Sequence, residues 1–234
     1  MKHETDSFEK ATVIGHPYSV TIPRWIDVPN VQNFRDIGGY PIKDGSGYIR
    51  ERTIFRCGHL GNITDDGIKT LQKLNVTAVF DFRSEPEIER YGKMPCVQGI
   101  TYYPSAMYKS IDVSPTKMAD HWKAYFEGPE GIARAYLHTL EVAKEQYGKI
   151  FLHIIEQFTP ESRKSLIAHC TAGKDRTGLF IALLLGLLNV DEEIIAKEYA
   201  LTNIGFWVTD EEIAFRAKAV GCKFEQMKEA TSAP

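Results

Sequence analysis

The sequence predicts a single α/β domain with a mostly parallel central sheet flanked by helices. Short apolar runs that suit buried strands occur in "TIFRCGHL" (53–60), "VTAVFDF" (76–82) and residues 165–168, and longer amphipathic stretches separate them. Such alternation of strands and helices is typical of a layered fold with a parallel sheet. The chain has 234 residues, of which 43% are hydrophobic, so it is long enough to bury a sizeable core.

Turn and cap signals define the first half of the chain. We expect residues 1–27 to form an arm packed on a domain that spans 28–234, because prolines interrupt any helix near the start. The motif "NFRDIGGY" (33–40) carries a turn signal at its two glycines. Thr64 precedes two acids and apolar residues at helical spacing, which predicts a helix over 63–75.

Amphipathic periodicity predicts mostly helices in the second half. Residues 116–127 and 131–147 have this pattern, with an interruption at Gly148 and a further helix in "GKIFLHIIEQF". We interpret 105–147 as a helical insertion and a candidate lid. The remaining expected helices are 176–189, one that starts in "DEEIIAKEYA", and a last one with Thr209 as its N-cap.

Charge and cysteine content exclude several classes of protein. The net charge of -3 provides no basic field for nucleic acid or for a membrane surface. The longest apolar run, "LFIALLLGLLNV", is about half the ~20 residues of a membrane span, and the first residues lack the apolar stretch of a signal peptide. We therefore expect a cytoplasmic protein with no transmembrane segment. The cysteines are too far apart for a zinc site or a disulfide scaffold: Cys57, Cys96, Cys170 and Cys222.

The segment "HCTAGKDRTG" (169–178) leaves an apolar strand and enters an apolar helix. Gly173 allows consecutive backbone N–H groups to point inward as an anion nest, and the helix N-terminus adds its positive dipole end. Arg176 supplies a planar fork suited to two phosphate oxygens. Cys170 lies at the floor of this positive field, which favours the thiolate, a nucleophile for phosphoryl transfer.

Other side chains of the same segment fit this chemistry. The Thr177 hydroxyl is placed to donate to the Cys170 sulfur, and Asp175 lies at the rim, where it can protonate a departing alcohol or phenol. The arginine and the backbone amides stabilise the charge, so we expect no metal and no cofactor. The expected substrate-binding residues are Thr171, Ala172, Gly173, Lys174 and Thr177.

Cysteine, five residues, arginine and then Thr-Gly resembles the signature of the protein tyrosine phosphatase superfamily. The form "HCxxGKDRTG" is most similar to microbial phosphatases with broad specificity toward phosphotyrosine, phosphoserine/threonine and phosphoinositides. The likeness continues in "NFRDIGGY", "IFRCGHL", "DFRSEPE" and "DEEIIAKEYALTN", and so covers roughly residues 28–203. It implies that Cys170 is the nucleophile, that Arg176 binds phosphate, and that Asp175 is the general acid.

The resemblance thus implies a cysteine-dependent phosphatase that acts through a phosphocysteine intermediate. Its implied substrates are phosphoproteins, carrying phosphotyrosine and also phosphoserine/threonine. A phosphoinositide headgroup is the alternative, because Lys174 is an extra cation that suits a neighbouring phosphate.

The chain also departs from that group of phosphatases at two points. Many of them have Ser where this chain has Cys57, which we interpret as a buried residue rather than a redox-active thiol. A redox or arsenate reductase function of the loop cysteine is therefore a remote alternative. The chain contains no Trp-Pro-Asp triplet, so no mobile acid loop is recognisable, and Asp81 and Asp112 stay open as substitutes for Asp175.

Three further sets of polar residues have supporting interpretations. We expect His169 to hydrogen-bond the backbone of the loop. Asp81 and Arg83 either form an ion pair at the end of a strand or contact the substrate. For Arg35 and Asp36 we favour a structural pair that anchors the N-terminal arm.

Overall fold

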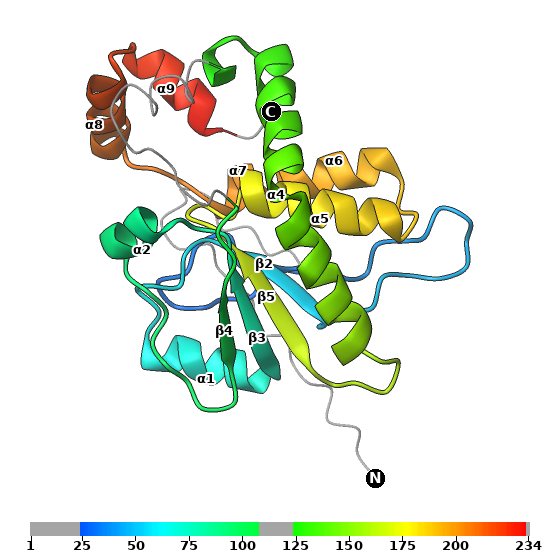
Figure 1. Cartoon of the computed structure of the whole chain (residues 1–234). Coiled ribbons are helices and arrows are strands. Elements are labelled where there is room, and N and C mark those ends of the chain that lie inside the picture. The colour runs from blue at the N-terminus through cyan, green and yellow to red at the C-terminus, as the bar shows by residue number, and fades with distance from the viewer. Residues whose placement is uncertain (1–23, 108–123, 233–234) are drawn as a thin grey trace.

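A five-stranded sheet lies at the centre of the molecule (Figure 1). The computed structural model describes residues 24–107 and 124–232. The strand order is β1-β2-β5-β3-β4, and every neighbouring pair is parallel except β1 with β2. The predicted α/β fold with a mostly parallel sheet is confirmed. The strands are β1 (Arg35–Asp36), β2 (Ile54–Cys57), β3 (Val76–Asp81), β4 (Thr101–Pro104) and β5 (Ser165–His169).

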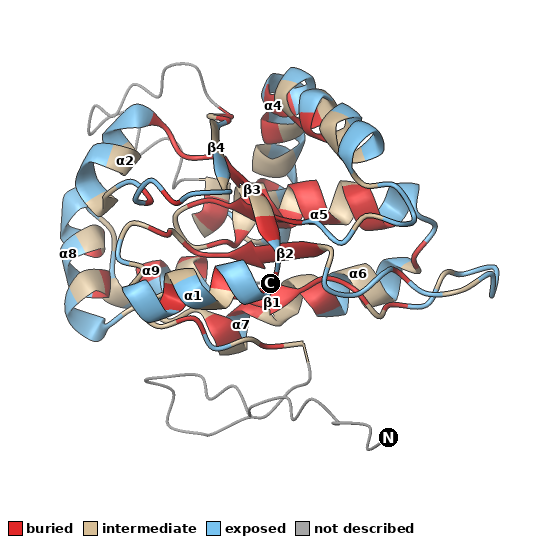
Figure 2. Ribbon diagram, turned by 90° about the horizontal axis from the view of Figure 1, so that it is seen from below, coloured by how far each residue is buried: buried red, intermediate tan, exposed pale blue. Residues whose placement is uncertain are grey.

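Helices cover both faces of this sheet, and two hydrophobic clusters fill the layers between them (Figure 2). One cluster joins Phe80 and Ala168 of the strands to α4 and α5. The other joins Phe55 and Ile167 to α1 on the opposite face. The helices are α1 (Asp65–Lys73), α2 (Glu85–Tyr91), α4 (Pro129–Gln157), α5 (Asp175–Leu187), α6 (Glu192–Ala200), α7 (Thr202–Gly205), α8 (Asp210–Val220) and α9 (Phe224–Thr231).

Side-chain caps start the helices where the sequence predicts them. The Thr64 hydroxyl accepts from the Gly67 amide at 3.2 Å, which starts α1. The Thr209 hydroxyl accepts from the Glu212 amide at 3.2 Å and starts α8. Both predicted caps are confirmed, because a hydroxyl that satisfies a free amide is the local signal of a helix start.

The second half differs from the prediction in two ways. The helix α4 runs through Gly148 without a break, because Tyr147 and Ile150 are buried in the core and outweigh the ~1 kcal/mol that glycine costs a helix. The helix capped by Thr209 is not the last one, since α9 follows it. Residues 108–123 lie outside the described residues, so the lid over 105–147 stays a prediction, and 129–147 belong to α4.

The helix α2 was not predicted, because its segment reads as a charged loop. Pro86 stands in its first turn, and the Glu87 carboxylate accepts from the Ser84 amide at 3.0 Å. This capping arrangement begins a helix directly after the carboxyl end of β3. Among the described residues, no helix is both long enough and apolar enough to cross a bilayer.

Candidate active site

The carboxyl ends of three central strands meet at one edge of the sheet. His169, the last residue of β5, is in register with Cys57 of β2 on one side and with Asp81 of β3 on the other. The loop that follows β5, residues 170–174, leads directly into α5. We call residues 170–176 the phosphate loop. The sequence motifs around β2, β3 and β5 therefore converge at the site expected for a parallel sheet.

Gly173 turns the phosphate loop against the end of β2. Its φ angle is 66°, in the left-handed region that favours glycine. A Cβ atom at this position would lie 2.2 Å from the Cys57 carbonyl oxygen, which is closer than van der Waals contact allows. Only glycine therefore fits at this point of the loop.

The carbonyl groups of the loop are held from behind by two buried side chains. The Asn33 amide donates to Ala172 O at 3.0 Å and to Gly173 O at 3.1 Å. The Arg56 guanidinium donates to Gly173 O at 2.5 Å and to Lys174 O at 3.2 Å. In a planar trans peptide the N–H group points opposite to the carbonyl, so these bonds turn the following N–H groups away from Asn33 and Arg56.

Those N–H groups form the anion nest that the sequence predicts. Within the described part of the chain, the amides of Gly173, Lys174 and Asp175 donate to no other group. They stand at the start of α5, where the helix dipole is positive. Three unsatisfied donors beside a helix N-terminus are suited to the oxygens of a phosphate group.

Cys170 begins the phosphate loop and is only 2% exposed. It belongs to the hydrophobic cluster on the α5 face of the sheet, whereas Cys57 belongs to the cluster on the opposite face. Burial, and then the neighbouring Cys170, raise the pKa of the Cys57 thiol well above its ordinary value. The two clusters thus place the Cys57 and Cys170 side chains on opposite faces of the sheet, which does not favour the redox alternative.

Arg176 is held by a residue that we did not predict, Glu87 of α2. Its two terminal nitrogens donate to the Glu87 carboxylate at 2.7 and 2.6 Å, a two-pronged pair. The Thr171 hydroxyl donates to the same carboxylate at 2.6 Å. Glu87 thus links the first residue after the cysteine to the arginine of the loop.

Burial opposes ionisation of Glu87, but Arg176 outweighs it and lowers the pKa of the carboxyl far below its usual range. The sequence held a signal for this residue. Glu87 lies in the charged stretch that follows β3, and the carboxyl end of β3 meets that of β5 at the site. A carboxylate at that edge is a candidate partner for the loop arginine, although spacing alone does not choose among Glu85, Glu87 and Glu89.

Asp175 is the first residue of α5 and contacts two tyrosines. The Tyr136 hydroxyl of α4 donates to Asp175 Oδ1 at 2.5 Å, and the Tyr199 hydroxyl donates to it at 3.3 Å. Burial, and then Asp175, raise the pKa of both tyrosines, so both remain protonated donors. Among the described residues nothing hydrogen-bonds Asp175 Oδ2, and Lys174 Nζ lies 3.8 Å from Oδ1.

The position of Lys174 differs from the expectation that its charge meets a neighbouring phosphate of the substrate. The residue is buried, and its ammonium donates to the carbonyls of Ala230, Thr231 and Ser232 at 3.1, 3.3 and 3.0 Å. These carbonyls end α9, where the helix dipole is negative and attracts a cation. Lys174 thus offers its backbone amide to the loop, while its charge binds the C-terminal helix.

Thr177 also differs from the prediction. Its hydroxyl is buried and has no hydrogen-bond partner in the described residues, so the bond to the Cys170 sulfur is not formed. The helix places Thr177 one turn beyond the free amides, with its backbone in α5.

The remaining supporting residues form a buried network beside the loop. His169 Nδ1 lies 3.2 Å from the Cys170 carbonyl oxygen, and burial lowers its pKa to about 4. Arg83 donates to the Asp81 carboxylate at 2.6 Å, and the Tyr102 hydroxyl donates to it at 2.7 Å. Asp81 is fully buried, so the ion pair braces the end of β3 and the carboxyl is not exposed to substrate. Asp112 lies outside the described residues.

The expected pair of Arg35 with Asp36 is wrong, because adjacent residues of a strand point to opposite faces. Arg35 Nε donates to Glu198 of α6 at 2.8 Å, and Arg56 donates to the other oxygen of the same carboxylate at 2.5 Å. Asp36 instead accepts from the backbone amides of Gly38 and Arg52 at 2.8 and 2.6 Å.

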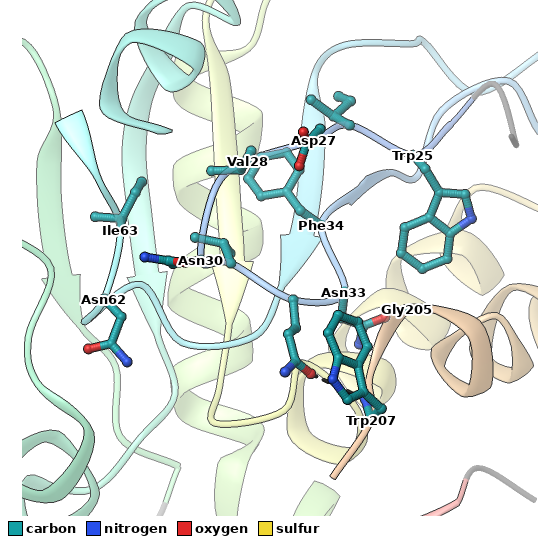
Figure 3. Close-up of a pocket in the computed structure, with 13 residues that line it drawn as sticks. Trp25, Asp27, Val28, Asn30, Asn33, Phe34, Asn62, Ile63, Gly205 and Trp207 are labelled. Atoms are coloured by element: carbon teal, nitrogen blue, oxygen red, sulfur yellow. Dashed lines mark hydrogen bonds between the residues drawn. The ribbon is translucent and has the colours of Figure 1, made fainter. Parts of the chain in front are cut away.

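A separate cavity of about 690 Å³ is lined in part by Asn33 (Figure 3). Trp25, Phe34 and Trp207 line it together with the amide side chains of Asn30, Gln32, Asn33 and Asn62. It contains no residue of the phosphate loop, so we place the active site at the loop and not in this cavity. In the described residues, no group of His, Cys, Asp and Glu is arranged to hold a metal ion.

The fold and the site define the class of protein: an α/β protein with a cysteine at the floor of a phosphate-binding loop. The sequence profile of the tyrosine phosphatase family matches residues 26–232. The chain therefore belongs to the tyrosine phosphatase family, and it is an enzyme of the phosphoric monoester hydrolase class. The resemblance inferred from the sequence motifs is confirmed.

Individual relatives share less than 30% of their residues with this chain over the matched regions. The triple specificity protein phosphatase PtpB of Mycobacterium tuberculosis is 27% identical over 195 residues, which are 76% of this chain and 68% of PtpB. A tyrosine-protein phosphatase of Nostoc commune is 29% identical over 147 residues, which are 63% of this chain and 47% of that protein. The crystal structure of P. aeruginosa TpbA is 16% identical, with 78% of this chain and 88% of TpbA covered and a TM-score of 0.33.

Proposed function

We propose that this chain hydrolyses phosphomonoesters of proteins, phosphotyrosine first and phosphoserine/threonine as a broader range, through a phosphocysteine intermediate. The observation that supports this proposal is the phosphate loop, in which seven consecutive residues contain Cys170, three amides that donate to no other described group, and the guanidinium of Arg176. The names of the relatives, a tyrosine-protein phosphatase and a triple specificity phosphatase, support this range of substrates.

In the first step the Cys170 thiolate attacks phosphorus, an S–P bond forms, and the P–O bond to the leaving group breaks. Asp175 donates its proton to the departing oxygen, and the amides and Arg176 bind the phosphoryl oxygens throughout. In the second step water attacks phosphorus, Asp175 takes a proton from the water, and the S–P bond breaks to give free phosphate and the thiolate.

Each of these roles has a geometric reason. Asp175 stands at the N-terminus of α5, beside the loop, and nothing among the described residues hydrogen-bonds its Oδ2 atom. Arg176 is held ready by Glu87, so its fork is ordered before the substrate arrives. Asp81 is fully buried in its ion pair, and the Glu87 carboxylate is bonded to Arg176 and Thr171, which favours Asp175 as the proton donor.

A phosphoinositide is not proposed as a second substrate. The sequence argument for it was the charge of Lys174, and that ammonium binds three carbonyls at the end of α9. Phosphoinositides belong in a substrate panel, where turnover comparable to that of phosphopeptides would show that Lys174 leaves α9 to meet a second phosphate.

The test is turnover of nitrophenyl phosphate in the presence of a chelator, with Cys170→Ser as the variant and Cys57→Ser as its matched control. We expect Cys170→Ser to abolish turnover and to keep phosphate binding, because the amides and Arg176 remain. Cys57→Ser should stay active, since Cys57 faces the other side of the sheet. Near-native turnover by Cys170→Ser would reject the covalent mechanism.

A further inference from the structure

Arg56 occupies an unusual place, because a charged side chain of a central strand is wholly buried behind the phosphate loop. Its exposed fraction is 0%, and it lies on β2 beside β5. One terminal nitrogen donates to Glu198 and the other to the carbonyls of Gly173 and Lys174. The guanidinium thus ties a carboxylate of α6 to the two peptide groups that precede α5.

These two carbonyls decide which way the loop amides face. The peptide groups that they belong to carry the N–H groups of Lys174 and Asp175, and a planar peptide puts N–H and C=O on opposite sides. Asn33 holds the preceding carbonyl, that of Ala172, in the same way. The Lys174 carbonyl also accepts from the Gly178 amide at 2.7 Å within α5, so the Gly173 peptide, whose carbonyl is held by Asn33 and Arg56, depends most on donors from outside the loop.

The buried charges of Arg35, Arg56 and Glu198 are also unbalanced. Arg35, Arg56 and Glu198 are exposed by 0%, 0% and 2%, so two cations share one anion away from water. Buried charge without full compensation is costly. Burial first, and then Arg56, lower the pKa of Arg35 to about 10, which reflects this repulsion. A buried positive charge behind the loop becomes favourable when a phosphate or a thiolate lies in front of it.

We propose that Arg56 is a positioning residue of the active site, which aims the loop amides at the phosphate by holding the Gly173 and Lys174 carbonyls. This inference rests on the proposed function of the same site. Arg35 provides a matched control, because it binds the same Glu198 from the same buried cluster and contacts no carbonyl of the loop directly. Its link to the loop is indirect, through the Oδ1 atom of Asn33. Removing Arg35 takes away the same charge and leaves the bonds from Arg56 to the loop in place.

The experiment compares Arg56→Met, Arg56→Lys and Arg35→Met by three measurements: kcat and KM on nitrophenyl phosphate, the inhibition constant of inorganic phosphate, and the melting temperature. We expect Arg56→Met to lower kcat at least ~100-fold, as loss of a preorganised donor does. We expect it to weaken inhibition by phosphate at least ~10-fold, about the worth of one hydrogen bond to a charged group. Arg56→Lys should fall between it and the wild type, because an ammonium keeps the charge and loses the fork.

Arg35→Met should lose a similar amount of melting temperature but keep kcat and the phosphate constant within ~10-fold of wild type, because Arg35 reaches the loop only indirectly, through the Asn33 side chain, and the bonds from Arg56 to the loop remain. Equal losses in Arg35→Met and Arg56→Met would overturn the inference in favour of a general charge or stability effect. A folded Arg56→Met protein with native kcat and native phosphate inhibition would also overturn it.

Should Arg56→Met fail to fold, Arg56→Lys decides the question. Weaker phosphate inhibition in a folded Arg56→Lys protein supports positioning, and an unchanged phosphate constant rejects it. A wild-type protein that neither turns over nitrophenyl phosphate nor is inhibited by phosphate would reject the proposed function itself, an outcome visible before any variant is made.

Discussion

Replacing Glu87 by alanine should loosen Arg176, the residue that we propose binds phosphate. The Glu87 carboxylate accepts two bonds from Arg176 and one from the Thr171 hydroxyl, and it also accepts from the Ser84 amide. Removing it leaves the guanidinium without its two-pronged partner. The bond from Arg176 to the Phe82 carbonyl is long, at 3.4 Å, so more of the ordering of the side chain falls to the substrate at each turnover.

The size of the effect follows from two opposing contributions. Ordering a free arginine side chain costs up to ~2 kcal/mol, which corresponds to ~30-fold in kcat/KM. Loss of the carboxylate also removes a negative charge near the substrate dianion. The Glu87 and Arg176 side chains are 22% and 17% exposed, so solvent screens this gain to no more than ~1 kcal/mol. The cost of ordering Arg176 therefore exceeds the gain from removing the charge, and the net loss in kcat/KM lies between ~5- and ~30-fold.

Two further variants separate the contributions. Glu87→Gln removes the same charge but keeps one acceptor oxygen for Arg176, so its loss in kcat/KM should be smaller than that of Glu87→Ala. Glu85 lies on the same helix and is exposed, so Glu85→Ala should have the same kcat/KM as the wild type. The assay is steady-state hydrolysis of nitrophenyl phosphate. If Glu87→Ala matched or exceeded the wild type in kcat/KM, charge repulsion would dominate and the positioning argument would fail.

Three other predictions test the neighbourhood of the loop. Asp175→Asn should reduce kcat strongly on phosphoserine and weakly on nitrophenyl phosphate, because only the poor leaving group needs a proton; equal losses on both substrates would reject Asp175 as the acid. The pKa of His169 is lowered to about 4, so the unfolded state binds its proton first as the pH falls. Titration of His169 should therefore lower the free energy of unfolding by about 3 kcal/mol as the pH falls from 6.5 toward 4. His169→Asn should reduce the change of melting temperature with pH over that interval. Lys174→Met should speed hydrogen exchange in residues 224–231, because α9 loses the cation at its end; unchanged exchange would show that α9 is held by its hydrophobic contacts alone.

Much of the site was open to prediction because its chemistry is local. Cys170, Gly173, Asp175 and Arg176 lie within seven residues, between an apolar strand and an apolar helix. A strand that enters a helix through glycine produces free amides at a helix N-terminus whatever surrounds it. The parallel sheet followed from the same short-range patterns of hydrophobicity.

Partners that are distant in the sequence could not be predicted in this way. Glu198 follows Arg35 by 163 residues and Arg56 by 142, and Glu87 precedes Arg176 by 89. Several carboxylates in each region suit an arginine equally well, so spacing does not choose among them. The sheet makes the choice when it brings the carboxyl ends of β2, β3 and β5 together.

Periodicity and contacts within a few residues were enough to predict the fold class, the loop at residues 170–176 and the family. The folded structure was needed to show that the Lys174 ammonium binds the end of α9, which face of the sheet Cys57 occupies, and which buried arginine holds the loop. These are decided by desolvation and by long-range packing. A buried charge must find a partner wherever the folded chain offers one, and that partner is known only after the layers of the fold have assembled.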